Sequence, residues 1–168
     1  MNVKNQFNNW MSVENKLPQL KNKIILVTGA SRGFGYQAAL QLATKGAHVI
    51  ASARTSGALE ELSEKILALG GRITVAPLDL CREKDFQILA RSIYEKFGKI
   101  DILVHSASLA IPMTPIQTIQ ESELLKFFDA NTFVTQRVIK IIHPLLKTNK
   151  ESIALFIQDA TNVKNKKY

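Results

Sequence analysis

Short apolar runs alternate along the chain with longer segments in which apolar residues recur every three or four positions. The apolar runs predict β-strands over residues 23–28, 48–53, 73–78, 100–104 and 153–157. The periodic segments predict amphipathic helices over residues 36–45, 59–69, 86–97 and 121–147. Because each of the first four strands is followed by a helix, we expect an open, doubly wound parallel α/β sheet with helices on both faces and strand order 3-2-1-4-5.

Two prolines and the apolar residues of one helix allow more detailed predictions for three of these elements. Pro77 lacks a backbone donor, which suits an edge strand or the end of a strand. Pro144 is a candidate point of disturbance in the last helix, because the residue before a proline resists helical angles. The helix after the first strand is predicted to turn one face inward, made of Phe34, Ala38, Leu42 and Ala43.

Length and composition indicate one globular domain. The chain has 168 residues, 46% of them hydrophobic, and its apolar runs are far too short to span a membrane. Residues 1–21 have little periodic pattern, so we expect an N-terminal extension followed by a domain over residues 22–168. The N-terminus lacks the apolar segment of a signal peptide, and Cys81 is the only cysteine. These features predict a cytoplasmic protein without an intrachain disulfide.

The net charge of +8 is spread along the chain, apart from a basic cluster over residues 164–167. Without interleaved aromatic residues or a DNA-binding motif, this distribution argues against a nucleic-acid partner. A basic balance also suits an anionic small ligand. We single out no metal-ligating group of residues.

The strongest candidate for chemistry is the turn Thr28-Gly29-Ala30-Ser31-Arg32-Gly33-Phe34-Gly35, between the first strand and the first helix. Glycines let the backbone turn tightly and approach a ligand, and the free N–H groups at a helix start attract an anion. The spacing is G-x-x-x-G-x-G, and no G-K-[ST] follows it, so the turn is not a P-loop. An ordinary strand-to-helix turn is the alternative, but the flanking elements favour a nucleotide phosphate site.

This turn resembles the cofactor loop of the short-chain dehydrogenase/reductase family, whose motif is T-G-x-x-x-G-x-G. The four fixed positions are occupied by Thr28, Gly29, Gly33 and Gly35. The resemblance covers about residues 20–160, and the turn is similar to that of 3-oxoacyl-carrier-protein reductases. It implies a Rossmann domain without the last strands of the family fold, with Ser31, Arg32 and Phe34 joining the glycines at the cofactor.

Two arginines favour NADP over NAD as that cofactor. Arg54 follows the second strand, where dinucleotide folds meet the adenosine ribose. An acidic residue there binds the 2′-hydroxyl of NAD, whereas an arginine accommodates the 2′-phosphate of NADP. Arg32 lies inside the glycine turn and is suited to contact the same phosphate. The alternative for Arg54 is an ordinary surface cation.

The ends of the third and fourth strands carry further candidates. The resemblance places Asp79 and Leu80 at the adenine, although Asp79 is also a candidate N-cap for the next helix. His105-Ser106-Ala107-Ser108 stands where the family commonly has Asn-Asn-Ala-Gly, so only Ala107 matches. We expect His105 to be a hydrogen-bonded structural residue rather than a base.

The resemblance implies a catalytic role for Asn131, which matches a family asparagine that distorts the long helix and holds a water in a proton relay. Family spacing places Asp159 where members have a serine that orients the substrate oxygen, and an ionised carboxylate cannot donate to a carbonyl. The family's acid–base tyrosine and the lysine four residues after it do not occur within residues 1–168. We therefore expect no turnover by these residues alone.

Taken together, these patterns predict an NADP-dependent short-chain oxidoreductase acting on a small carbonyl or alcohol substrate. The chain would be either a fragment of a longer reductase or a short version that binds the cofactor. The alternative is a noncatalytic dinucleotide-binding or interaction module. Apolar residues along the helix at 121–147 predict self-association through that helix.

Overall fold

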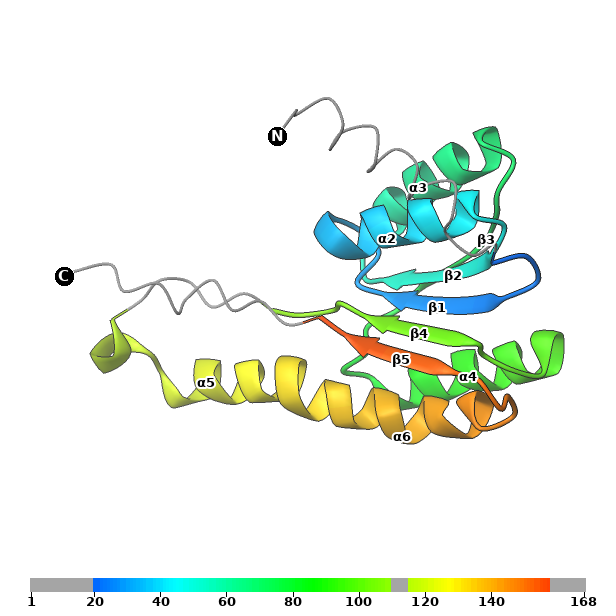
Figure 1. Cartoon of the computed structure of the whole chain (residues 1–168). Coiled ribbons are helices and arrows are strands. Elements are labelled where there is room, and N and C mark those ends of the chain that lie inside the picture. Colours follow the sequence, from blue (N-terminus) through cyan, green and yellow to red (C-terminus); the bar gives the residue numbers. More distant parts are fainter. Residues whose placement is uncertain (1–19, 110–114, 158–168) are drawn as a thin grey trace, which may run out of the picture.

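The computed structural model describes residues 20–109 and 115–157, which form one parallel sheet flanked by helices (Figure 1). The strands are β1 (Ile24–Thr28), β2 (His48–Ala53), β3 (Arg72–Pro77), β4 (Ile102–His105) and β5 (Ile153–Phe156). Their order is β3-β2-β1-β4-β5, and every neighbouring pair is parallel. The predicted fold class and strand order are confirmed, and Pro77 ends an edge strand as expected.

Helices cover both faces of the sheet. They are α2 (Gly33–Thr44), α3 (Ser56–Ala68), α4 (Glu83–Phe97), α5 (Glu121–Phe128) and α6 (Val134–Leu146), with a 3₁₀ turn η1 (Ile116–Thr118) and a π-helical turn η2 (Asp129–Phe133). In Figure 1, α2 and α3 lie on one face, and α4 and α6 lie on the other. Alternate strand residues therefore feed two cores, with Leu26 and Leu103 packed toward α4 and α6, and Val27 and Val49 toward α2 and α3.

The buried face of α2 differs from the prediction. Its buried residues are Gly35, Ala39 and Ala43, while Phe34 is 53% exposed. The helix begins at Gly33, and its first turn lies close against the loop after β4. A Cβ on Gly35 would overlap the side-chain oxygen of Ser106. Only glycine fits on that side of the first turn, so Phe34 points outward.

The predicted long helix is the continuous segment α5–η2–α6. The disturbance lies at Asp129–Phe133 and not at Pro144, which α6 incorporates. Because Pro144 is two residues from the end of α6, the backbone hydrogen bond that it cannot donate is lost near the end of the helix. Val138 and Ile142 of α6 are fully buried against the sheet.

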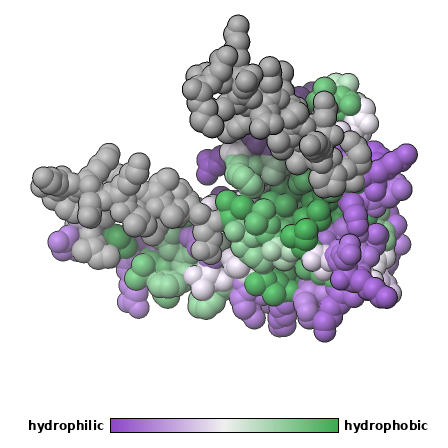
Figure 2. Space-filling model, viewed as in Figure 1, coloured by the Kyte–Doolittle hydropathy of each residue, from purple (hydrophilic) through white to green (hydrophobic). Residues whose placement is uncertain are grey.

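The exposed apolar side chains include one group on the long helical segment and another on edge strand β5. Phe128 and Phe133 are exposed on the long helical segment, where self-association stays a prediction. Ile153 and Leu155 of edge strand β5 are 59% and 44% exposed, and Figure 2 shows apolar side chains gathered in the middle of the view, over the region of β4 and β5. None of the helices described is long and apolar enough to cross a membrane.

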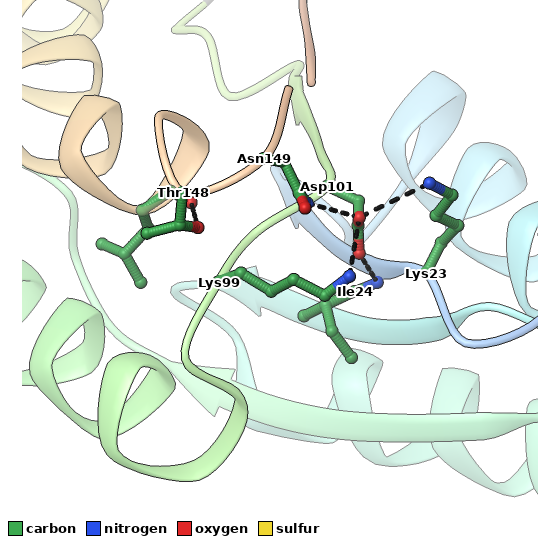
Figure 3. Close-up of polar contacts among 7 residues, drawn as sticks. Lys23, Ile24, Lys99, Asp101, Thr148 and Asn149 are labelled. Carbon is green, nitrogen blue, oxygen red and sulfur yellow. Dashed lines mark hydrogen bonds and ion pairs between the residues drawn. The ribbon is translucent and has the colours of Figure 1, made fainter. Parts of the chain in front are cut away.

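At the edge of the sheet where the parallel strands begin, which we call the amino edge, Asp101 contacts four residues (Figure 3). We call Asp101 and these four residues the Asp101 cluster. The carboxylate accepts hydrogen bonds from Ile24 N–H (2.7 Å), Asn149 Nδ2 (2.5 Å) and Lys99 Nζ (3.0 Å). Lys23 Nζ adds an ion pair at 3.6 Å. Burial by itself raises the pKa of Asp101, but the Ile24 hydrogen bond and the two lysines outweigh it and hold the pKa below its ordinary value. The cluster joins β1 and β4 to the turn that precedes β5.

Candidate functional site

A pocket of about 790 Å³ lies at the opposite edge, where the strands end. In open α/β sheets, ligands bind at the carboxyl ends of the strands, at the point where the strand order reverses. Here the order reverses between β1 and β4. The ten residues predicted to contact a cofactor all line this pocket, namely Gly29, Ser31, Arg32, Gly33, Phe34, Gly35, Arg54, Asp79, Leu80 and Ala107.

The three glycines of the turn meet three different requirements. Gly29 has a left-handed φ of +72°, and a Cβ there would lie 2.6 Å from the backbone nitrogen of Ala107. A Cβ on Gly35 would overlap Gly29 O and Ser106 Oγ. Gly33 also has a left-handed φ, +57°, yet no protein atom lies within 4 Å of its Cβ position. Gly29 and Gly35 thus permit close packing on the loop after β4, and Gly33 leaves room on the pocket side.

The start of α2 offers unsatisfied donors to this pocket. Arg32 is the N-cap residue but makes no side-chain capping hydrogen bond, and the first turn holds no acidic residue. The first N–H groups of an α-helix have no intrahelical partner, and the helix dipole makes this end partly positive. The geometry therefore suits an anionic group, such as a phosphate, at the start of α2.

Two cationic side chains belong to the lining of this pocket. Arg32 and Arg54 both line it, and both are exposed. Across the described ranges, neither guanidinium has an ion-pair or hydrogen-bond partner. No carboxylate lies in the glycine turn or directly after β2. This corner is consequently free to bind a further negative charge.

Asp79 lines the pocket but does not cap α4, so the capping alternative is wrong. The helix begins at Glu83, and its N-cap is Arg82. Asp79 Oδ1 instead accepts a hydrogen bond from Cys81 N at 3.0 Å, within a local turn. Cys81 also lines the pocket and was not predicted to, although it directly follows Asp79 and Leu80. Burial and the nearby Asp79 and Asp129 raise the pKa of the Cys81 thiol to about 11, so it stays protonated at neutral pH.

His105 is a hydrogen-bonded structural residue, as predicted. Its side chain is buried, with Nδ1 2.7 Å from Thr28 Oγ1 and Nε2 3.2 Å from Thr135 Oγ1. Its ring also packs on Phe156, with ring centroids 5.7 Å apart. Burial lowers the pKa of His105 to about 4, so the imidazole is neutral at physiological pH.

Asn131 lies in the π-helical turn η2, where the resemblance places a distortion. Its Oδ1 accepts from Leu109 N at 2.9 Å, and its Nδ2 donates to Leu109 O at 3.1 Å. The side chain thereby holds the loop after β4 and does not itself line the pocket, whereas Ala130 and Val134 do. Asp159, the other candidate for catalysis, lies outside the described residues.

The structure also brings in residues that the sequence analysis did not single out. Ser52, Thr55 and Ala130 line the pocket, and Thr135 supports it through His105. Thr55 lies next to Arg54, so its position at a strand end was the available signal. Within the described segments, no three His, Cys, Asp or Glu side chains are grouped so that they could hold a metal ion.

Comparison with known proteins agrees with this geometry. A family model described as short chain dehydrogenase matches residues 23–162. An uncharacterized oxidoreductase of Listeria monocytogenes is 35% identical over 112 residues, which are 67% of this chain and 45% of that protein. Human hydroxysteroid dehydrogenase-like protein 2 is 32% identical over 146 residues, covering 83% of this chain and 35% of the human protein. The chain thus spans less than half the length of these two relatives.

Two solved structures share the fold. A 7α-hydroxysteroid dehydrogenase in complex with NADH and 7-oxo glycochenodeoxycholic acid superposes with a TM-score of 0.80 and 28% identity, over 88% of this chain and 57% of that one. A metagenomic short-chain oxidoreductase in complex with NADP has a TM-score of 0.81 and 24% identity, over 88% and 67% of the two chains. With the family model matching most of its length, the chain belongs to the short-chain dehydrogenase family.

Proposed function

We propose that this chain forms the NADP-binding domain of an oxidoreductase that reduces a small carbonyl compound or oxidises the corresponding alcohol. The observation that carries this proposal is that Arg32, in the glycine turn, and Arg54, directly after β2, line the same pocket. Both arginines lack a protein partner within the described segments, so both are available to a 2′-phosphate.

The pocket residues fit the successive parts of a dinucleotide. The uncapped start of α2 and the open space at Gly33 suit the pyrophosphate. Asp79 and Leu80, which follow β3, suit the adenine, and Arg54, at the end of β2, suits the phosphate on its ribose. The other nucleotide then extends over the loop after β4, toward Ala107 and Ala130. When bound, the nicotinamide supplies or accepts the hydride, and the protein residues bind and orient it.

The choice of NADP rests on the arginines and not on family membership. The similar 7α-hydroxysteroid dehydrogenase was solved with NADH. That relative supports a nicotinamide dinucleotide as the ligand and leaves its 2′-substituent open. In this chain, an arginine and no carboxylate directly follows β2, and this arrangement favours the phosphorylated form.

Calorimetric titration of the wild type and of Arg54→Ala with NADP and NAD tests the proposal. We expect the wild type to bind NADP more tightly than NAD. Loss of one charge-assisted phosphate contact in Arg54→Ala should weaken NADP binding by about 1.5–3 kcal/mol and leave NAD binding unchanged. Arg91→Ala is the matched control, because Arg91 is an exposed arginine on α4 that pairs with Glu95 outside the pocket.

Equal affinity of the wild type for the two dinucleotides would contradict the choice of NADP. Absence of binding by either dinucleotide to a folded wild type would contradict the whole proposal. An equal loss of affinity in Arg54→Ala and Arg91→Ala would show that general electrostatic attraction, and not a 2′-phosphate contact, accounts for the effect.

A second candidate function is cofactor binding without turnover. Asp159 favours it, because a carboxylate stands where the family has an orienting hydroxyl and would repel a developing oxyanion. An assay of NADPH oxidation against a panel of carbonyl compounds separates the two functions when it uses the chain extended through any in-frame downstream sequence, because residues 1–168 hold neither the tyrosine nor the lysine of the family. Tight NADP binding with no oxidation would support this second function over the first.

A further inference from the structure

His105 does not line the pocket, but each of its two hydrogen-bond partners and His105 itself directly adjoin a lining residue, namely Gly29, Val134 and Ser106. Thr28, which directly precedes the glycine turn, contacts one ring nitrogen at 2.7 Å. Thr135 contacts the other at 3.2 Å and lies one helical turn after Asn131. His105 itself precedes the loop over residues 106–109. One side chain therefore connects β1, β4 and the long helix directly beneath the pocket.

The hydrogen-bond directions define one tautomer. Thr135 Oγ1 donates its single proton to Asn131 O at 2.8 Å. It must then accept from His105 Nε2–H, and this leaves Nδ1 unprotonated to accept from Thr28 Oγ1–H. Every polar atom of the two hydroxyls and the ring has a partner in this arrangement.

Asn131 in turn is hydrogen-bonded to the loop that follows His105. The Asn131 side chain holds both the N–H and the C=O of Leu109, four residues after His105. The path from His105 through Thr135 to Asn131 therefore returns to the loop that His105 begins. We call these residues, with Thr28, the His105 cluster, namely Thr28, His105, Leu109, Asn131 and Thr135. Within it, the loop after β4 cannot move independently of η2.

We propose that His105 is a positioning residue of the dinucleotide site, which holds η2 and the loop after β4 at a fixed separation from the glycine turn. This inference rests on the proposed NADP binding. In the proposed binding mode, the adenosine end would lie near Arg54 and Asp79, after β2 and β3, whereas the His105 cluster adjoins the pocket after β4 through Leu109. The ring therefore sets the shape of the part that receives the nicotinamide nucleotide.

Paired ligands test this role. NADP occupies both halves of the site, whereas 2′,5′-ADP occupies only the adenosine half. Thr135→Val keeps the side-chain volume but removes the acceptor of His105 Nε2–H. We expect this variant to weaken NADP binding on the order of tenfold, the value of about one hydrogen bond, while 2′,5′-ADP affinity stays within about twofold of the wild type. Thr135→Ser, which restores the hydroxyl, should restore NADP affinity.

Further variants keep the test decisive. His105→Phe retains a ring but loses both hydrogen bonds, and should show the same selective loss of NADP affinity. Asp101→Ala is the control for lost stability alone, because Asp101 lies at the other edge of the sheet; it should leave both affinities unchanged. Equal weakening of both ligands in Thr135→Val, or no weakening of either, would overturn the positioning role. A wild type that binds 2′,5′-ADP but not NADP would overturn it too, whereas a wild type that binds neither refutes the proposed function itself.

Discussion

The two ends of β4 carry buried polar side chains of opposite character. Asp101, just before the strand, is an ionised carboxylate held by Lys99 and Lys23. His105, the last residue of the strand, is a neutral imidazole held by two hydroxyls. Both connect β1 and β4 to the segment that contains α6. A fixed negative charge therefore lies at the edge away from the pocket, and the pocket edge is held together without one.

This difference has a physical consequence for ligand binding. A buried carboxylate beneath the pocket would repel the phosphates of a dinucleotide, and a buried imidazolium would carry a large desolvation cost. Neutral hydrogen bonds of His105 connect β1, β4 and α6 at the carboxyl ends of the strands, so the potential of the pocket is determined by its lining, namely the start of α2, Arg32, Arg54 and Asp79. The Asp101 cluster lies away from the pocket, so its charges contribute to the stability of the fold and not to ligand binding.

The largest effect on stability should come from the amino edge. Asp101→Ala leaves the buried Ile24 N–H without its acceptor and removes the hydrogen bond of Asn149. We expect the free energy of unfolding to fall by about 2–4 kcal/mol in urea titrations. Lys99→Ala should cost less than about 1 kcal/mol, because the lysine is partly exposed. Similar losses in the two variants would show that the Asp101 cluster is held mainly by the Lys99 ion pair.

The second expected effect is a pH dependence of the free energy of unfolding that differs between His105 and Asp101, at the two ends of β4. His105 has a pKa of about 4 in the folded protein and an ordinary value of 6.5, so the unfolded chain binds the proton first as the pH falls. His105 therefore destabilises the fold progressively from about pH 6.5 toward pH 4, by about 2–3 kcal/mol between pH 7 and pH 4.5. The lowered pKa of Asp101 acts only below its ordinary value of 3.8, where protonation removes its contribution.

Unfolding free energies of the wild type and His105→Asn, measured from pH 7 to pH 4.5, test this dependence. The variant should lose less stability than the wild type over that interval. The pKa of His48 is also lowered, by burial and by the nearby Arg72 and Lys96, so it contributes to both proteins and cancels in the comparison. Parallel curves for the two proteins would contradict the assignment to His105.

Local patterns predicted the strands, their order and the glycine turn, since each is encoded in adjacent residues, whereas the family resemblance supplied Asp79, Leu80 and Ala107 of the pocket lining. Local patterns failed at helix starts. Phe34, predicted on the buried face of α2, is exposed, and the N-cap of α4 is Arg82 and not the candidate Asp79. The Asp101 cluster and the His105 cluster could not be predicted from local patterns. Asp101 is hydrogen-bonded to Ile24, and His105 to Thr28, across 77 residues of sequence. Nothing local to either residue indicates such a partner.

Amide hydrogen exchange of the wild type with and without NADP tests most directly whether the carboxyl edge is the functional end. We predict slower exchange over residues 29–35 and 106–109 when NADP is bound, because the ligand covers the glycine turn and the loop after β4. Exchange at residues 99–101 and 147–151, around the Asp101 cluster, should not change. Unchanged exchange at the glycine turn, or equal slowing at both edges, would contradict the account.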